Sequence, residues 1–215
     1  VSEVDVPIID KNYFRGVVNS SIIKNSVSRK HSGGSTGVPL TYYLSRQSMS
    51  YFWPSIWRAF DVYKIKPFDN VMMIAGPSLY NNRSMIRQIY DKVNNFTIIS
   101  AFDLSDAAIQ KALDLISKKK IKAIFGYTSS ILSFVEYLSL NNIFINLSTI
   151  FTTSESFIPS IRPLVKKHCN CDVIDIYGAN DGGITAFECQ MHQGYHVNYE
   201  RTMVEIIDKK IILTD

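Results

Sequence analysis

Apolar residues along the chain alternate between short continuous runs and longer segments of helical spacing. The runs Val71–Ala75, Ile121–Phe125 and Val173–Tyr177 are typical of buried strands, whereas apolar positions from Arg46 to about Lys64 recur every three or four residues. The same alternation predicts further strands at Thr41–Ser45, Phe96–Ser100 and Ser148–Thr152, and helices at Arg83–Val93, from Ser105 or Asp103 to Lys119, at Ser129–Leu140 and at Ile158–His168. We therefore expect an α/β fold with a mostly parallel sheet flanked by helices.

The two ends of the chain depart from this alternation. Residues 1–30 have no regular pattern and are predicted to be an irregular lead-in. After Gly183 the pattern changes to short strands, which we expect to be antiparallel: Thr185–Cys189, Tyr195–Tyr199, Met203–Ile207 and Lys210–Leu213. The prediction is an α/β core over residues 1–183 with a small β-rich extension of the same domain over 184–215.

Composition narrows the class of protein. A chain of 215 residues that is 46% hydrophobic and 20% charged can fold as one globular domain, which excludes a disordered polypeptide. The net charge of +4 is scattered, so we expect no nucleic-acid partner, and no apolar run is long enough to span a membrane. The three cysteines and the lack of a leader pattern predict a cytoplasmic protein without a disulfide framework.

A loop rich in glycine and hydroxyl side chains lies between His31 and Pro39. It contains Ser32, Gly33, Gly34, Ser35, Thr36 and Gly37. Glycines let the backbone approach a ligand closely, and free N–H groups with hydroxyls can surround an anionic oxygen. The loop lacks the Gly-Lys-Ser/Thr ending of a Walker motif. The sequence alone leaves two alternatives open, a phosphate-binding loop and an ordinary Gly/Ser turn.

Polar residues also follow three of the predicted strands. The segments are Gly126-Tyr127-Thr128-Ser129, Thr153-Ser154-Glu155 and Tyr177-Gly178-Ala179-Asn180-Asp181. Each could be a simple turn, because Gly, Ser, Asn and Asp are common turn residues. However, ligands of open α/β sheets bind at the carboxyl ends of the strands. Together with the glycine-rich loop, the three segments predict one ligand site at that edge.

In this order, the four segments resemble motifs of the adenylate-forming enzymes. The resemblance is to the phenylacetate–CoA ligase-like branch, which includes proteins linked to capsular polysaccharide synthesis, and it covers Val6 to Asp215. It implies that the loop cradles the phosphates of ATP, with Thr36 as a catalytic residue, and that the Tyr177 ring stacks on adenine. It also implies that Asp181, where the family has Glu, is catalytic and holds Mg²⁺.

The resemblance implies roles for further residues. Ser154, Glu155, Gly178 and Asn180 would line the nucleotide, and Tyr127, Thr128 and Ser129 would line the pocket for a carboxylic acid. The expected reaction joins the acid to ATP as an acyl-adenylate, with CoA as a later acceptor. The chain matches part of the family's large N-terminal domain, and the mobile C-terminal domain is expected to be absent. The alternative function is a non-catalytic nucleotide- or acyl-binding module. For the oligomeric state, a homodimer is one of the alternatives.

A second candidate site lies near the C-terminus. Cys189, His192 and His196 have a spacing that suits a structural zinc ion, because sulfur and imidazole are preferred zinc ligands. The resemblance implies a zinc ion near this position in some relatives. The alternatives are a free buried cysteine and two histidines that flank a hairpin turn.

Overall fold

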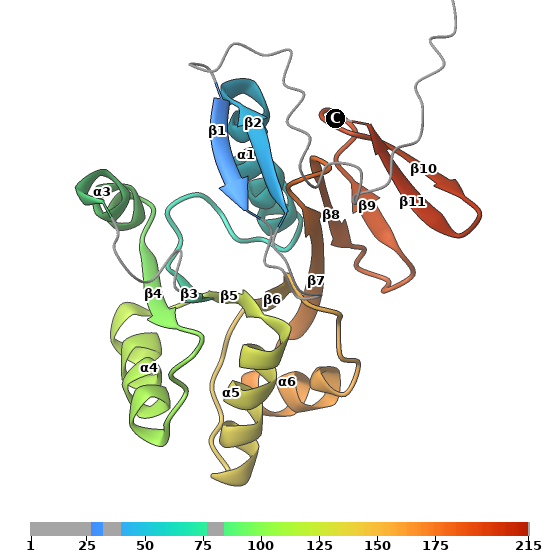
Figure 1. The fold of residues 1–215 in the computed structure, drawn as a ribbon. Helices are drawn as coiled ribbons and strands as arrows, with labels where there is room; N and C mark the ends of the chain where they lie inside the picture. The colour runs from blue at the N-terminus through green and yellow to red at the C-terminus, as the bar shows by residue number, and fades with distance from the viewer. Residues whose placement is uncertain (1–26, 32–39, 77–83, 215) are drawn as a thin grey trace, which may run out of the picture. The chain divides into compact units, whose positions relative to one another are not determined.

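The computed structural model describes residues 27–31, 40–76 and 84–214, which belong to two compact units (Figure 1). The larger unit consists of Ile56–Gly178 and Ala186–His196. The smaller unit contains the described residues up to Ser55, together with Ala179–Thr185 and residues 197–214.

A seven-stranded sheet is the centre of the larger unit. Its order is β4 (Phe96–Ser100), β3 (Val71–Ala75), β5 (Ala123–Tyr127), β6 (Thr149–Thr153), β7 (Asp172–Ala179), β8 (Ile184–Glu188) and β9 (Tyr195–Val197). The first five strands in this order pair in parallel. A short turn joins β7 to β8, and so short a connection permits only antiparallel pairing. The expected α/β fold with a mostly parallel sheet is confirmed.

Helices alternate with these strands, as the hydrophobic spacing predicts. They are α1 (Arg46–Val62), α3 (Met85–Val93), α4 (Asp106–Lys119), α5 (Thr128–Leu140) and α6 (Ile161–Cys169). Local residues set their ends: the Ser84 side chain accepts a hydrogen bond from the N–H of Arg87 and begins α3, and Lys120 ends α4 in the left-handed conformation. The prediction that the last helix begins at Ile158 is wrong, because Ser160 is its N-cap and Pro159 lies before it.

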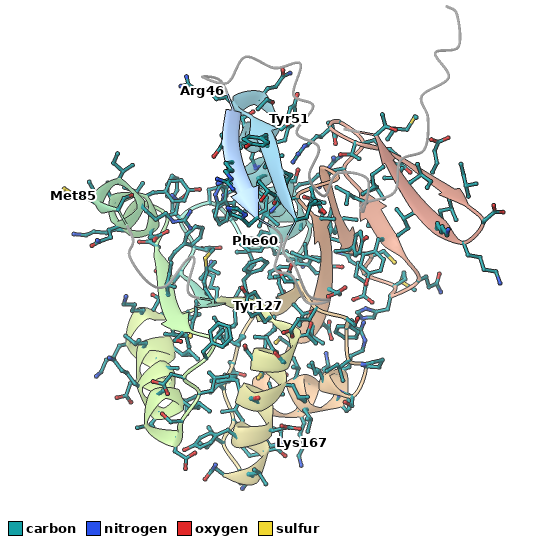
Figure 2. The ribbon with its side chains drawn as sticks, in the orientation of Figure 1. Arg46, Tyr51, Phe60, Met85, Tyr127 and Lys167 are labelled. Carbon is teal, nitrogen blue, oxygen red and sulfur yellow. The ribbon has the colours of Figure 1, made fainter. Side chains whose placement is uncertain are left out.

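Both faces of the sheet in the larger unit are covered, as a parallel sheet requires. On one face, α4, α5 and α6 lie next to one another (Figure 1), and Phe134 of α5 packs in one cluster with Ile124 and Ile150. Alternate residues of the same strands point to the other face. There Phe60 of α1 stacks on Phe151 with ring centroids 4.5 Å apart and meets the edge of Phe125 (Figure 2).

Two antiparallel hairpins belong to the smaller unit: β1 (Val27–His31) with β2 (Thr41–Ser45), and β10 (Met203–Ile207) with β11 (Lys210–Thr214). The second confirms the predicted antiparallel tail. The first shows that the prediction of an irregular lead-in over residues 1–30 is wrong for residues 27–30. His31 pairs with Thr41, and the glycine-rich segment between them lies outside the described residues. No helix in the described part of the chain has the length and apolar character needed to cross a membrane.

Candidate functional site

One edge of the parallel sheet brings together the segments that begin at Gly126 and Thr153. The first residues of the segment that begins at Tyr177 lie at the same edge. In the sheet register, Tyr127 at the end of β5 pairs with Thr153 at the end of β6, and Thr153 pairs with Ile176 of β7. Glu155, two residues after β6, and Tyr177, in the last part of β7, therefore lie at the carboxyl edge, where α/β proteins bind ligands. Tyr177 is 39% exposed, so its ring is available to a ligand.

Glu155 is fixed at this edge by one residue of the neighbouring segment. One carboxylate oxygen accepts the backbone N–H of Ser129 at 2.7 Å, and the other accepts the Ser129 hydroxyl at 3.0 Å. Ser129 lies in the first turn of α5, where the helix dipole favours a negative charge. The residue before Glu155, Ser154, has a φ of +67°, a left-handed conformation that is uncommon for serine. The end of β6 therefore turns sharply to place this carboxylate against α5.

Tyr127, the last residue of β5, lies at the same edge and contacts the end of the neighbouring strand β3. A Cβ atom on Gly76, at the end of β3, would lie 2.6 Å from the Tyr127 hydroxyl. A larger residue in place of Gly76 would therefore require the Tyr127 hydroxyl to shift. Next to Tyr127, Thr128 is fully buried, and its hydroxyl has no hydrogen-bond partner among the described residues. Of the three residues predicted to line the acid pocket, Thr128 is therefore buried, whereas Tyr127 is partly exposed and Ser129 is exposed.

The remaining predicted site residues lie elsewhere. Gly178 ends the larger unit as an exposed residue of β7, whereas Asn180 and Asp181 belong to the smaller unit. Burial raises the pKa of Tyr42, and the charge of Asp181 raises it further, so Asp181 lies near Tyr42 within that unit. Ser32, Gly33, Gly34, Ser35, Thr36 and Gly37 lie outside the described residues.

The expected zinc site at Cys189, His192 and His196 is not supported. No group of three or more His, Cys, Asp or Glu residues in the described ranges is arranged to hold a metal ion. His196 packs on the Phe187 ring with centroids 5.3 Å apart, and Cys189 Sγ accepts the N–H of Gln193. The segment is instead a turn, closed by backbone bonds from Cys189 to Gly194 and from His192 to Cys189.

An ionic network around Glu188, the last residue of β8, was not predicted from the sequence. Glu188, only 6% exposed, accepts a hydrogen bond from Arg162 at 2.6 Å and lies 3.1 Å from Nδ1 of His192. Burial pushes the pKa of Glu188 up, but hydrogen bonds from Arg162 and from the N–H of Asp175, with the Arg162 charge, more than offset this and lower it. The buried carboxylate is therefore ionised and structural.

The fold identifies the class of protein to which the chain is similar. The chain has the fold of the acid–CoA ligases that form acyl-adenylates. The resemblance seen in the sequence is therefore confirmed at the level of the fold. A 2-hydroxyisobutyryl-CoA ligase, solved with its acyl-adenylate and CoA, matches 94% of this chain and 50% of its own with a TM-score of 0.66 and 13% identity. A long-chain-fatty-acid-CoA ligase from Archaeoglobus fulgidus matches 86% of this chain and 39% of its own, with a TM-score of 0.60 and 13% identity.

Sequence comparison gives a weaker match. Protein CapK from Staphylococcus aureus is 23% identical over 183 residues, which cover 82% of this chain and 41% of that protein. No family model matches the sequence. The chain spans half or less of the length of these relatives.

Proposed function

We propose that the protein, by itself or as part of a longer polypeptide, activates a carboxylic acid with ATP to form an acyl-adenylate. The observation that carries the proposal is the carboxyl edge of the sheet. Residues that the sequence resemblance assigns to the acid and the nucleotide, such as Tyr127, Glu155 and Tyr177, lie at or near the ends of neighbouring strands there, in a sheet with the ligase fold. The 2-hydroxyisobutyryl-CoA ligase that shares the fold was solved with an acyl-adenylate and CoA, which supports CoA as the later acceptor.

In the proposed reaction, a carboxylate oxygen of the acid attacks the α-phosphorus of ATP. A new oxygen–phosphorus bond forms, the bond to the bridging oxygen of the β-phosphate breaks, and pyrophosphate leaves. No protein nucleophile is needed, so the protein acts by alignment and by balancing charge. Hydroxyl and N–H groups of residues 32–37 would hold the phosphates, and the exposed ring of Tyr177 would stack on the base.

Magnesium has a suitable ligand in Asp181. This ion prefers carboxylate oxygen and usually takes few protein ligands, and Asp181 is a partly exposed carboxylate. When bound, the metal would neutralise charge on the phosphates. The carboxylate of Asp181 is one methylene shorter than that of the glutamate of the resembling motif, which favours a second candidate function: a module that binds the nucleotide without turnover.

Pyrophosphate exchange distinguishes the two functions. The purified protein is incubated with ATP, Mg²⁺ and labelled pyrophosphate, together with single acids from an aromatic, fatty and hydroxy-acid panel. Exchange that depends on one acid, and that is lost in Thr36→Val and Asp181→Ala, is expected for an adenylating enzyme. Thermal stabilisation by ATP without exchange would instead indicate the binding module. No response to ATP in either assay would contradict both functions.

A further inference from the structure

The carboxylate of Glu155 is held by two hydrogen bonds from a single residue. Ser129 donates its N–H to one oxygen at 2.7 Å and its hydroxyl to the other at 3.0 Å. Both residues are exposed, yet the two bonds and the first turn of α5 restrict the carboxylate to one orientation. An exposed glutamate side chain would otherwise sample many rotamers, so this arrangement needs an explanation.

The backbone at the same position is also unusual. Ser154 has a φ of +67°, a conformation uncommon for serine, and this turn directs the chain from the end of β6 toward α5. The neighbouring strands β5 and β6 bring Ser129 and Glu155 together across the carboxyl edge, 26 residues apart in sequence. Two independent features, the bidentate bond and the left-handed residue, therefore aim the same side chain.

From this geometry we infer that Ser129 is a positioning residue for Glu155, and that it acts on the ligand through this carboxylate. The inference rests on the proposed function and changes one part of it, because Ser129 was expected to contact the acid directly. Each carboxylate oxygen has two acceptor sites, of which Ser129 occupies one. The remaining acceptor sites would be available to a donor group of bound ATP, and at the first turn of α5 the N–H of Ser129 already donates to Glu155.

A cycle of variants tests the inference through affinity for ATP·Mg²⁺, measured by titration calorimetry. Ser129→Ala keeps the N–H bond and loses the hydroxyl bond, so we expect about threefold to tenfold weaker binding, and Ser129→Thr should restore it. In a Glu155→Gln background, Ser129→Ala should have little further effect, because coupled residues are not additive. Ser133→Ala, an exposed serine of the same helix, is the matched control and should bind as the wild type does.

The outcomes separate the inference from the proposed function. If the wild-type protein binds ATP·Mg²⁺ and Ser129→Ala binds equally well, Ser129 does not position the ligand-binding carboxylate. An equal loss in the wild-type and Glu155→Gln backgrounds would also overturn the inference, because Ser129 would then act independently of Glu155. If the wild-type protein itself does not bind ATP·Mg²⁺, the proposed function fails, and the inference fails with it.

Discussion

Two buried threonines at the ends of neighbouring strands provide an internal comparison of hydrogen bonding. Thr128 and Thr152 are both 0% exposed. The Thr152 hydroxyl donates to the buried carboxylate of Asp175 at 2.8 Å, whereas the Thr128 hydroxyl has no partner among the described residues. Valine replaces each side chain with almost the same shape, so the two substitutions differ mainly in the bond that they remove.

We expect opposite effects on the free energy of unfolding. Hydrogen bonds to a charged group contribute about 1.5–3 kcal/mol, so Thr152→Val should lower stability by about 2 kcal/mol. A partial compensation remains, because the other oxygen of Asp175 still accepts the Tyr195 hydroxyl at 2.7 Å. Thr128→Val removes a buried hydroxyl that makes no hydrogen bond to any described residue, so it should leave stability unchanged or raise it by up to about 1 kcal/mol.

Urea unfolding followed by circular dichroism measures the difference. The midpoint should fall for Thr152→Val and stay equal or rise for Thr128→Val, with the same slope in both variants. For a domain of this size, 2 kcal/mol corresponds to a melting temperature about 4–8 °C lower, which a thermal scan can verify. Equal losses in both variants would show that the fit of the methyl group added in place of the hydroxyl, rather than loss of the hydrogen bond to Asp175, determines the change in stability.

The hydrophobic pattern predicted the parallel sheet well, because both faces of the sheet are covered and most buried residues of its strands are apolar. It did not predict β1, where Ser28, Arg29 and Lys30 show no alternation. This strand forms because β2 supplies the partners for its backbone hydrogen bonds. Backbone pairing between two segments does not require a hydrophobic periodicity in either segment.

The sequence could predict which residues of the candidate site lie near one another, where their position at the end of a strand determines this. Polar residues that follow parallel strands must meet at one edge, so the neighbourhood of Tyr127 and Glu155 could be inferred from the sequence. The bond from Ser129 to Glu155 could not, because it depends on the exact turn after β6. The zinc spacing of Cys189 and His192 was misleading for a related reason. The spacing of these residues along the chain shows only that their side chains could reach one metal ion. In the folded chain His192 instead contacts Arg162 and Glu188.

Two further predictions concern thiols and the Glu188 network. In the native protein we expect a thiol reagent to modify Cys189 first, because burial raises the pKa of Cys169 to about 12 and also raises that of Cys171. In denaturant all three cysteines should react. Rapid reaction of all three in the native protein would contradict the burial of Cys169 and Cys171. Replacing Arg162 with Met leaves the Glu188 carboxylate buried without its main partner, which should cost about 3 kcal/mol at neutral pH. Because the folded pKa of Glu188 is lowered, its contribution to stability is present above the pKa of an unfolded glutamate and is lost as the pH falls through the folded value. Without Arg162 that pKa rises, so urea midpoints measured from pH 7 to pH 3 should begin to fall at a higher pH in the variant than in the wild type. Parallel pH profiles for the two proteins would show that the ion pair does not determine the protonation of Glu188.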